Sequence, residues 1–322
     1  MSGGADWRAS ATRERLQARA TLLARAREFF ATRGLMEVDT PLLVNAPVSD
    51  VHIHSARVQL AAAAAPLYLH TSPEYAMKRL LAGGSGDIYQ ICHVVRGEES
   101  GARHNPEFTL IEWYRIGAGL EALMDEVEAL VRALLAERAP RGSERVSYRE
   151  AFRRETGLDP LAAPVAELAR AAADTGFRGD AASTRDEWLE LLMATRIGPQ
   201  LGRGTLTFLY GYPASQAALA RLDPQDPRVA QSFELYCEGL ELANGFHELG
   251  AADEQRERFR RDNEERRRRG LPEAPLDERL LDALASGLPD CAGVALGFDR
   301  TLMLAVGASH IDQVLAFPTS RA

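Results

Sequence analysis

The strand-like segments of this chain occur in neighbouring pairs, and this pairing restricts its fold more than any other feature. Apolar and polar side chains alternate along residues 88–95 and again along 108–116, with a polar loop rich in charge, Gly and Pro between them. A second pair lies within residues 233–246, where Glu238-Gly239 suits a two-residue turn. Strands joined in this way run antiparallel, so we expect an antiparallel sheet.

Segments with helical periodicity surround these strands. Apolar residues recur at helical spacing along residues 13–32 and 120–134, and a charged helix is expected over 253–269. A strand over 293–296 is followed by a helix over 299–306. Residues from about 140 to 205 are rich in Ala and Arg and are predicted to be a mainly helical insertion. The predicted class is therefore α+β, with one domain over residues 1–322 and an antiparallel sheet flanked by helices.

Composition and charge exclude several other classes. The chain has 322 residues, of which 46% are hydrophobic and 26% charged, a globular composition. Its net charge of −8 disfavours non-specific nucleic-acid binding, which needs a basic surface. The three cysteines, Cys92, Cys237 and Cys291, form no zinc or disulfide pattern. Because no apolar segment resembles a signal peptide or a bilayer span, we expect a cytoplasmic protein without a membrane partner.

The basic residues of the chain are almost all arginine. Lys78 is the only lysine among 38 Lys and Arg residues. Together with the abundance of alanine, this bias indicates codon usage.

The first segment that could carry chemistry is residues 88–115. In its second strand Phe108, Leu110, Glu112 and Tyr114 share one face, because side chains alternate along a strand. Phe108 and Tyr114 are separated by roughly 20 Å at about 3.3 Å per residue. An aromatic ring at one end and a carboxylate with a phenol at the other would suit an elongated ligand. An ordinary amphipathic hairpin is the alternative.

The second segment is the acidic hairpin over residues 232–249. If Glu238-Gly239 forms the turn, Tyr236 faces Glu241 across the ladder and Glu234 lies diagonally on the same face. Two carboxylates repel each other unless a cation lies between them, and oxygen ligands suit Mg²⁺. A solvent-facing acidic pair is the alternative. We expect Asn244-Gly245 to break the second strand, which leaves Glu248 without a predicted place.

The third segment is GVALGFDRTLML, residues 293–304. A buried strand ends in glycine, and a helix opens at Asp299 with Arg300 in its first turn. Free N–H groups, the helix dipole and the guanidinium together predict an anion site.

Taken together and in this order, the segments resemble the three motifs of class II aminoacyl-tRNA synthetases. FFATRGLMEVDTPLL resembles motif 1, VRGEE with HNPEFT resembles motif 2, and ALGFDR resembles motif 3. HNPEFT, IEWY and ELANGFHEL are similar in detail to lysyl-tRNA synthetases. Because motif 1 is a dimer-interface helix and strand, the resemblance implies a homodimer. It also implies an enzyme that uses ATP and Mg²⁺.

The resemblance implies a set of nucleotide contacts. Arg96 would hold the α-phosphate and the carboxylate, and Arg300 would hold the γ-phosphate; these are the two expected catalytic residues. Phe108 would stack on adenine, and Glu98 would contact its amino group. Glu234 would hold Mg²⁺ together with Glu241. The other ATP contacts it implies are Gly97, His104, Asn105, Glu241, Leu242 and Gly297.

The resemblance also implies an amino-acid pocket. Glu74 and Ser72, both from TSPEY, would bind the amino group, and Asn244 would face the carboxylate. Tyr114 and Glu248 would bind the distal ammonium. Pro73 and Ala295 complete the implied substrate contacts.

Three positions depart from the pattern of lysyl-tRNA synthetases. Ala295 stands where those enzymes have glycine, and the resemblance implies that it reshapes the pocket towards β-lysine. Gly97 replaces an asparagine and Phe298 a smaller aliphatic residue. Both substitutions leave the charged residues and their implied roles in place, but the resemblance does not fix the affinity for the substrates.

The N-terminal end also departs from that family. Motif 1 begins about twenty residues from the start, so we expect no anticodon-binding OB-fold, which is a five-stranded barrel. Over nearly its whole length the chain resembles truncated paralogues of lysyl-tRNA synthetase, the elongation factor P–(R)-β-lysine ligases. This resemblance implies that ATP activates (R)-β-lysine or lysine as an adenylate. The acyl group would then pass to the ε-amino group of a lysine on elongation factor P.

Two other functions remain open at this point. A truncated synthetase could charge tRNA or a small amine, although the acidity and the expected lack of an OB-fold do not favour tRNA. A non-catalytic paralogue could sense an amino acid. Such a protein should have lost a phosphate arginine or a metal carboxylate, yet Arg96, Arg300, Glu234 and Glu241 are all present.

Overall fold

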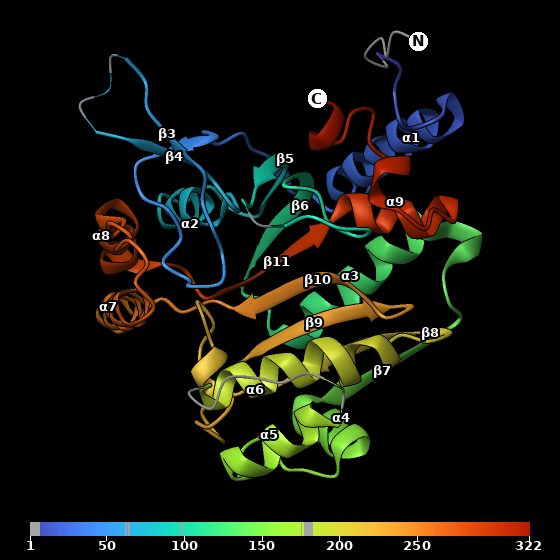
Figure 1. Ribbon diagram of the computed structural model, residues 1–322. Helices are drawn as coiled ribbons and strands as arrows, with labels where there is room; N and C mark the ends of the chain where they lie inside the picture. The colour runs from blue at the N-terminus through green and yellow to red at the C-terminus, as the bar shows by residue number, and fades with distance from the viewer. Residues whose placement is uncertain (1–6, 62, 64, 98, 175, 177–182) are drawn as a thin grey trace, which may run out of the picture.

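A large mixed sheet forms the centre of the molecule. The computed structural model describes residues 7–61, 63, 65–97, 99–174, 176 and 183–322. Eight strands lie in the order β1-β5-β6-β11-β10-β9-β8-β7 (Figure 1). Within this sheet the two outermost pairs, β1·β5 and β7·β8, are parallel, and the other pairs are antiparallel. The predicted α+β class is confirmed, and the predicted antiparallel pairing is confirmed for every pair of this sheet except the two outermost.

The strands indicated by alternation are present, and others extend the sheet. The inner strands are β5 (Ile88–Val95), β6 (Glu107–Ile116), β9 (Ser232–Cys237), β10 (Leu240–His247) and β11 (Cys291–Gly297). The others are β1 (Met36–Glu37), β7 (Gly142–Ser147) and β8 (Thr205–Tyr210). The predicted turn is confirmed, because Glu238 and Gly239 both have positive φ and Tyr236 lies opposite Glu241.

The predicted break at Asn244-Gly245 is wrong. β10 continues through both residues to His247. A Cβ on Gly245 would lie 2.6 Å from the ring of Phe233 on the neighbouring strand, so this glycine makes room for an aromatic side chain and does not end the strand. The ladder is irregular between Glu241 and Ala243 instead, and the shift places Asn244 opposite Glu234.

Three helices and one face of the sheet enclose the main hydrophobic core. The helices are α1 (Arg13–Ala31), α3 (Leu120–Leu135) and α9 (Phe298–Val306). Phe30 of α1 is fully buried and stacks on Tyr89 of β5 with ring centroids 4.4 Å apart. It also contacts Trp113 of β6 at 5.2 Å. The predicted helices over 13–32, 120–134 and 299–306 therefore form one layer, which leaves the opposite face of the sheet for other residues.

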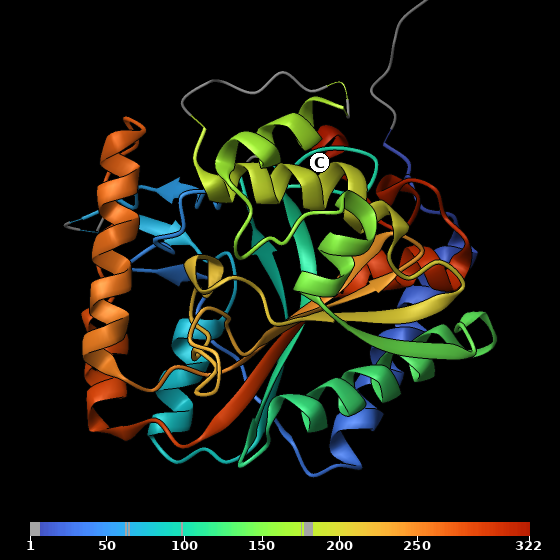
Figure 2. The same cartoon turned by 90° about the horizontal axis from the view of Figure 1, so that it is seen from below.

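The segment between β7 and β8 packs around a second core. It contains α4 (Tyr148–Thr156), α5 (Val165–Ala173), α6 (Arg185–Leu192), a π turn (Met193–Ile197) and a 3-10 turn (Gly198–Gln200). Phe152, Leu168 and Leu189 pack here with Leu209 and Tyr236 from the sheet. Figure 2 shows α4, α5 and α6 on the opposite side of the strands from α1 and α3. β7 was not anticipated from the sequence.

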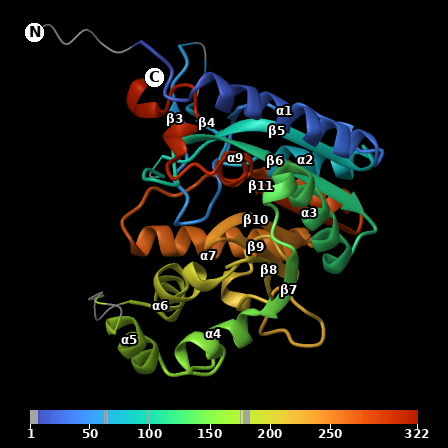
Figure 3. The ribbon, with the colours of Figure 1, turned by 90° about the vertical axis from the view of Figure 1, so that its right-hand side faces the viewer.

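A third group of elements lies beside the β5–β6 hairpin. It consists of α2 (Glu74–Ala82), α7 (Ala252–Arg268), α8 (Glu278–Gly287) and a small sheet of β2 (Leu43–Val44), β3 (Arg57–Val58) and β4 (Leu67–Leu69) (Figure 1). Figure 3 shows α2, α7, β3 and β4 from the side. Short 3-10 turns occur at Ala136–Arg138, Ala214–Gln216, Ile311–Gln313 and Thr319–Arg321. Among the helices formed by the described residues, none has the length and apolar character that a bilayer span requires.

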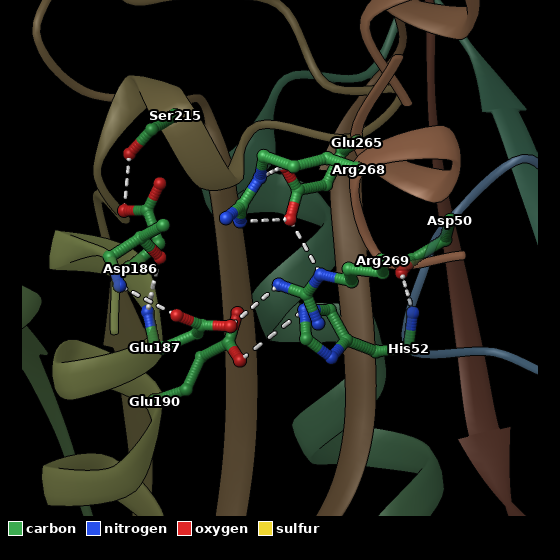
Figure 4. A network of polar contacts seen from close by, with 10 residues as sticks. Asp50, His52, Asp186, Glu187, Glu190, Ser215, Glu265, Arg268 and Arg269 are labelled. Atoms are coloured by element: carbon green, nitrogen blue, oxygen red, sulfur yellow. Dashed lines mark hydrogen bonds and ion pairs between the residues drawn. The ribbon is translucent and has the colours of Figure 1, made fainter. Parts of the chain in front are cut away.

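A polar network fastens α6 to the end of α7 and to the loop before β3 (Figure 4). Arg269 donates hydrogen bonds to Glu187 at 2.9 Å and to Glu265 at 2.5 Å. From the loop, His52 Nε2 lies 3.6 Å from a carboxylate oxygen of Glu190. Glu187 and Arg269 are 82 residues apart in the chain, and His52 and Glu190 are 138 residues apart, so the network joins segments that are distant in sequence.

Candidate active site

One row of directly opposed residues crosses the middle of the sheet. Glu112 of β6 lies opposite Ala295 of β11, Ala295 lies opposite Asn244 of β10, and Asn244 lies opposite Glu234 of β9. Trp113, the neighbour of Glu112 along its strand, packs in the core beneath α1, α3 and α9. Because side chains alternate along a strand, this row lies on the face that those helices leave uncovered.

A pocket opens at one end of this face. It collects side chains from the loop between β5 and β6, from β6, from the irregular part of β10 and from the junction of β11 with α9. The sequence-predicted residues that line it are Arg96, His104, Asn105, Phe108, Glu241, Leu242, Asn244, Ala295, Gly297 and Arg300. The structure therefore brings most of the predicted nucleotide contacts together with two of the predicted substrate contacts.

Arg96 and Phe108 form one wall of the pocket. The guanidinium carbon of Arg96 lies 5.2 Å from the centre of the Phe108 ring. Arg96 also donates to the carbonyl of Thr71 at 3.3 Å and to Glu99 at 3.1 Å. These contacts hold a cation directly beside an aromatic face, an arrangement that can bind an anionic group and a flat ring together.

Arg300 lies on the opposite wall, in the first turn of α9. Its guanidinium donates to the carbonyl of Glu241 at 3.0 Å, and the Glu241 carboxylate lies 3.9 Å away. Asp299 beside it accepts the N–H of Thr109 at 2.6 Å and pairs with Arg19, which fixes this turn against β6 and α1. The predicted helix start with an arginine in its first turn is present, and such an arrangement attracts anions.

The acidic pair consists of Glu234 and Glu241, and two tyrosines anchor Glu234. Tyr212 and Tyr236 both donate to Oε2 of Glu234, the latter at 2.7 Å, and Nδ2 of Asn244 lies 3.4 Å from Oε1. Burial and the neighbouring charge of Glu241 raise the pKa of Glu234 to about 8. A cation beside these oxygens would relieve both effects, which fits a hard ion such as Mg²⁺.

Glu234 and Glu241 alone provide too few ligands for a metal ion. Within the described part of the chain, no three His, Cys, Asp or Glu side chains are grouped as metal ligands. Mg²⁺ commonly takes one or two carboxylates and completes its shell with water and nucleotide phosphates. The residues present therefore fit an ion that arrives together with a nucleotide.

The other end of the face is a buried polar cluster. Glu112 is 2% exposed and accepts hydrogen bonds from Ser72 at 2.7 Å and from the Tyr114 hydroxyl at 2.8 Å. The Ser72 hydroxyl accepts the N–H of Glu74 at 3.0 Å, where α2 begins. Burial, with the charges of Glu74 and Glu248, raises the pKa of Glu112 to about 8.

Glu248 closes this cluster from the end of β10. Lys78 Nζ lies 2.5 Å from Oε2 of Glu248 and 2.8 Å from Oε1 of Glu74. Burial alone would lower the pKa of Lys78, but the two carboxylates outweigh it and raise the pKa. A Cβ on Gly293 would lie 2.2 Å from the Tyr114 ring and 2.6 Å from Glu248, so only glycine lets both side chains lie against β11.

The two ends of the face therefore carry different sets of charged groups. Three carboxylates and one ammonium gather in the buried cluster, namely Glu74, Glu112, Glu248 and Lys78. Three arginines line the pocket at the other end, where they stand beside the carboxyl groups of Glu99, Glu241 and Asp299. An elongated ligand with ammonium groups at one end and phosphates at the other matches these two sets of groups, because ammonium groups pair with carboxylates and phosphates pair with arginines.

The remaining predicted residues have definite places in the structure. Pro73 is buried at the N-cap of α2, and the N–H of Gly97 donates to the carbonyl of His54 at 2.8 Å. Asn105 uses its amide to bond the Glu107 carbonyl at 2.5 Å and the Thr319 N–H at 3.0 Å. It thus holds the C-terminal segment to the pocket wall. Glu98 lies outside the described residues.

Sequence reasoning missed three residues of the site. Glu112 was placed on the correct strand face but was not included among the substrate contacts. Lys78 was noticed as the only lysine, a signal that could have marked it. Tyr212 follows β8, which was not predicted, so no pattern linked it to Glu234.

Comparisons with known proteins agree with these motifs. The pattern of the family described as tRNA synthetases class II (D, K and N) matches residues 4–321. A Vibrio cholerae serotype O1 protein named elongation factor P–(R)-β-lysine ligase is 49% identical over 323 residues, which cover 98% of this chain and 99% of that protein. Proteins of the same name from Yersinia enterocolitica and Salmonella paratyphi B are 49% and 47% identical over 328 residues, each covering both chains completely.

The raised pKa of Glu112 predicts how stability depends on pH. Its pKa is about 8 in the folded chain against 4.5 ordinarily, so the folded state holds the proton more tightly. The contribution of Glu112 to stability therefore falls as pH rises from about 4.5 to about 8. The glutamine in Glu112→Gln does not titrate. The free energy of unfolding of this variant should therefore rise relative to that of the wild type as pH increases through this range. Urea unfolding at about pH 5, 6.5 and 8 measures the difference.

The exposed Glu264 on α7 provides the control. Glu264→Gln should differ from the wild type by the same small amount at each pH. A difference between Glu112→Gln and the wild type that stays constant over the range would contradict the assignment.

Proposed function

Because the chain belongs to the family of class II tRNA synthetases (D, K and N), we propose that it acts as an elongation factor P–(R)-β-lysine ligase. It is an ATP-dependent aminoacyl ligase. It activates (R)-β-lysine as an aminoacyl-adenylate and transfers the β-lysyl group to the ε-amino group of a lysine on elongation factor P.

The different charged groups at the two ends of the site carry this proposal. A diamino acid brings two ammonium groups, which match the surplus of buried carboxylates around Glu112. ATP brings an adenine ring and phosphates, which match Phe108, Arg96 and Arg300. The row from Glu112 to Asn244 joins the two ends, so the carboxylate of the amino acid can meet the α-phosphate between them.

In the nucleotide pocket, Phe108 stacks on adenine and Arg96 holds the α-phosphate. Arg300 binds the γ-phosphate from the first turn of α9. The other ATP contacts are Gly97, His104, Asn105, Glu241, Leu242 and Gly297. The contact with the adenine amino group is assigned to Glu98 from the motif alone, since this residue lies outside the described part of the chain. Burial and nearby Arg300 lower the pKa of His104, which favours the neutral imidazole beside the phosphates.

Glu234 and Glu241 would hold Mg²⁺, and water and phosphate oxygens would complete its shell. When bound, the ion neutralises charge on the phosphates that leave as pyrophosphate. The hydroxyls of Tyr212 and Tyr236 both bond Oε2 of Glu234. Oε1, which lies near Nδ2 of Asn244, is therefore the oxygen that would contact the ion.

In the amino-acid pocket, Glu74 binds the amino group near the reacting carboxylate, together with Ser72 and Pro73. Tyr114 and Glu248 bind the distal ammonium. Asn244 faces the carboxylate, and Ala295 shapes the floor between Glu112 and Asn244.

The chemistry needs no nucleophile from the protein. A carboxylate oxygen of the amino acid attacks the α-phosphorus, and pyrophosphate leaves. Arg96 and Arg300 are placed to stabilise the charge that develops during this displacement, while both pockets hold the reactants in line. The acceptor amine then attacks the acyl carbon, AMP leaves, and the amine loses a proton as the amide forms.

The assembly and the location of the protein belong to the same proposal. Residues 1–322 form one catalytic domain in which about 140–205 are an insertion, and two copies pair through the motif 1 segment that contains α1 and β1. The protein works in the cytoplasm, and tRNA is not its acceptor.

The direct test is the intact mass of elongation factor P after incubation with this protein, ATP, Mg²⁺ and (R)-β-lysine. We expect a gain of one lysyl unit, larger with (R)-β-lysine than with α-lysine in a parallel reaction. A third reaction replaces the factor with total tRNA. Charged tRNA beside an unmodified factor would mean a truncated synthetase, and no product in any reaction would favour an amino-acid sensor.

Removing the guanidinium of Arg300 should stop activation but not folding. Arg300→Ala removes a charge that binds the leaving phosphates, so the rate of (R)-β-lysine-dependent ATP–pyrophosphate exchange should fall by about 100-fold or more. The exposed Arg279 on α8 supplies the control, since Arg279→Ala should keep the wild-type rate. Near-normal exchange by Arg300→Ala, with an unchanged circular dichroism spectrum, would remove Arg300 from the mechanism.

Shortening Ala295 should change which amino acid is preferred. The Ala295 methyl lies between Glu112 and Asn244 in the floor of the pocket. Ala295→Gly frees the volume of one methyl group, and a difference of that size changes the discrimination between two substrates by about tenfold. We expect kcat/KM for α-lysine to rise against that for (R)-β-lysine in the exchange assay. An unchanged ratio would show that this side chain does not set the preference.

A further inference from the structure

Lys78 is buried in the amino-acid pocket and takes no part in the mechanism described above. Its side chain is completely buried, and its ammonium lies between Glu74 and Glu248 at 2.8 and 2.5 Å. Glu74 and Lys78 are four residues apart on α2, so they lie on the same face of that helix. Glu248 comes from the end of β10. One ammonium therefore links two elements that carry substrate-binding carboxylates.

The composition of the chain singles out the same residue. Of 38 basic residues, 37 are arginine, and Lys78 is the one lysine. A bias towards arginine has thus acted at every other basic position but not at this one. An ammonium is a compact charge with three donors, whereas a guanidinium is a wide planar fork. A fully enclosed place between two carboxylates distinguishes the two groups, while an exposed surface does not.

We propose that Lys78 is a positioning residue of the amino-acid pocket, whose ammonium holds Glu74 and Glu248 at the spacing that receives the two amino groups of the substrate. This inference rests on the proposed function. It adds a residue that does not touch the reacting atoms and acts through the two carboxylates.

The arrangement of oxygens explains how the ammonium can position the two carboxylates without blocking the binding of a ligand. Lys78 contacts Oε1 of Glu74 and Oε2 of Glu248, so each carboxylate keeps one oxygen for a ligand. The free Oε1 of Glu248 faces Tyr114 across the space left by Gly293. Without a cation between them, two buried carboxylates repel each other and take up protons, and both changes weaken an ammonium site.

The count of charges agrees with a resident cation. Glu74, Glu112 and Glu248 would carry three negative charges when ionised, and Lys78 cancels one of them. The remaining two match the two ammonium groups of a diamino acid. If Lys78 only filled the place of a substrate ammonium, its removal would instead free that place and tighten binding.

The test is a comparison of Lys78→Met and Lys78→Arg with the wild type in ATP–pyrophosphate exchange. We expect KM for (R)-β-lysine to rise by about tenfold or more in both variants, while KM for ATP stays within about twofold. Arg79→Met removes one positive charge from the next position, which is exposed, and should leave both constants unchanged. Wild-type KM for the amino acid in either Lys78 variant, or a lowered KM, would overturn the proposal.

Chemical rescue separates positioning from a general loss of structure. Lys78→Ala leaves a cavity beside Glu74 and Glu248, which ethylammonium or propylammonium can enter as a substitute cation. We expect these amines to lower KM for (R)-β-lysine in Lys78→Ala and to leave the wild type unaffected. Absence of rescue, with ATP still bound and thermal unfolding still cooperative, would count against Lys78 as a positioning residue.

Calorimetric binding of (R)-β-lysine distinguishes a failure of this inference from a failure of the proposed function. A wild type that binds the amino acid but gives no exchange would contradict the ligase function, and the affinities of the variants would still test Lys78. A wild type that binds and exchanges, with variants of equal affinity, would contradict the role of Lys78 alone. A wild type that does not bind the amino acid would overturn both.

Discussion

The antiparallel pairing of β11 with β6 on one side and β10 on the other is the constraint on which the site depends. It brings two hairpins that are more than 100 residues apart into one sheet and aligns Glu112, Ala295 and Asn244. β11 has only small side chains on this face, because Gly293 must leave space for Tyr114 and Glu248. The strand therefore provides both the register of the site and the room for its ligand.

The site lowers the stability of the fold, because it buries carboxylates that water would otherwise solvate. Hydrogen bonds from Ser72 and Tyr114 offset part of this cost at Glu112, and Lys78 offsets part of it at Glu248. The pKa of both carboxyl groups nevertheless remains raised, so the compensation is incomplete. Two ammonium groups of a ligand would complete it, which links the affinity for a diamino acid to the same unfavourable burial.

Much of the architecture followed from local patterns. Alternation placed β5 and β6, a turn of two residues placed Tyr236 opposite Glu241, and helical spacing placed α1 and α3. The pattern failed at Gly245, because a glycine that accommodates a neighbouring ring looks in sequence like a glycine that ends a strand. It also missed β7, a short edge strand whose alternation is weak because most of its side chains are exposed.

The sequence by itself determined the segments that carry chemistry, their order along the chain and the family they indicate, because these depend on residues that are neighbours in the chain. Only the tertiary structure decided that Asn244 lies opposite Glu234, that Tyr212 bonds the same carboxylate, and that Lys78 bridges Glu74 and Glu248. Those contacts depend on strand register and on the packing of α2 against the end of β10, and neither leaves a repeating signal in the order of residues.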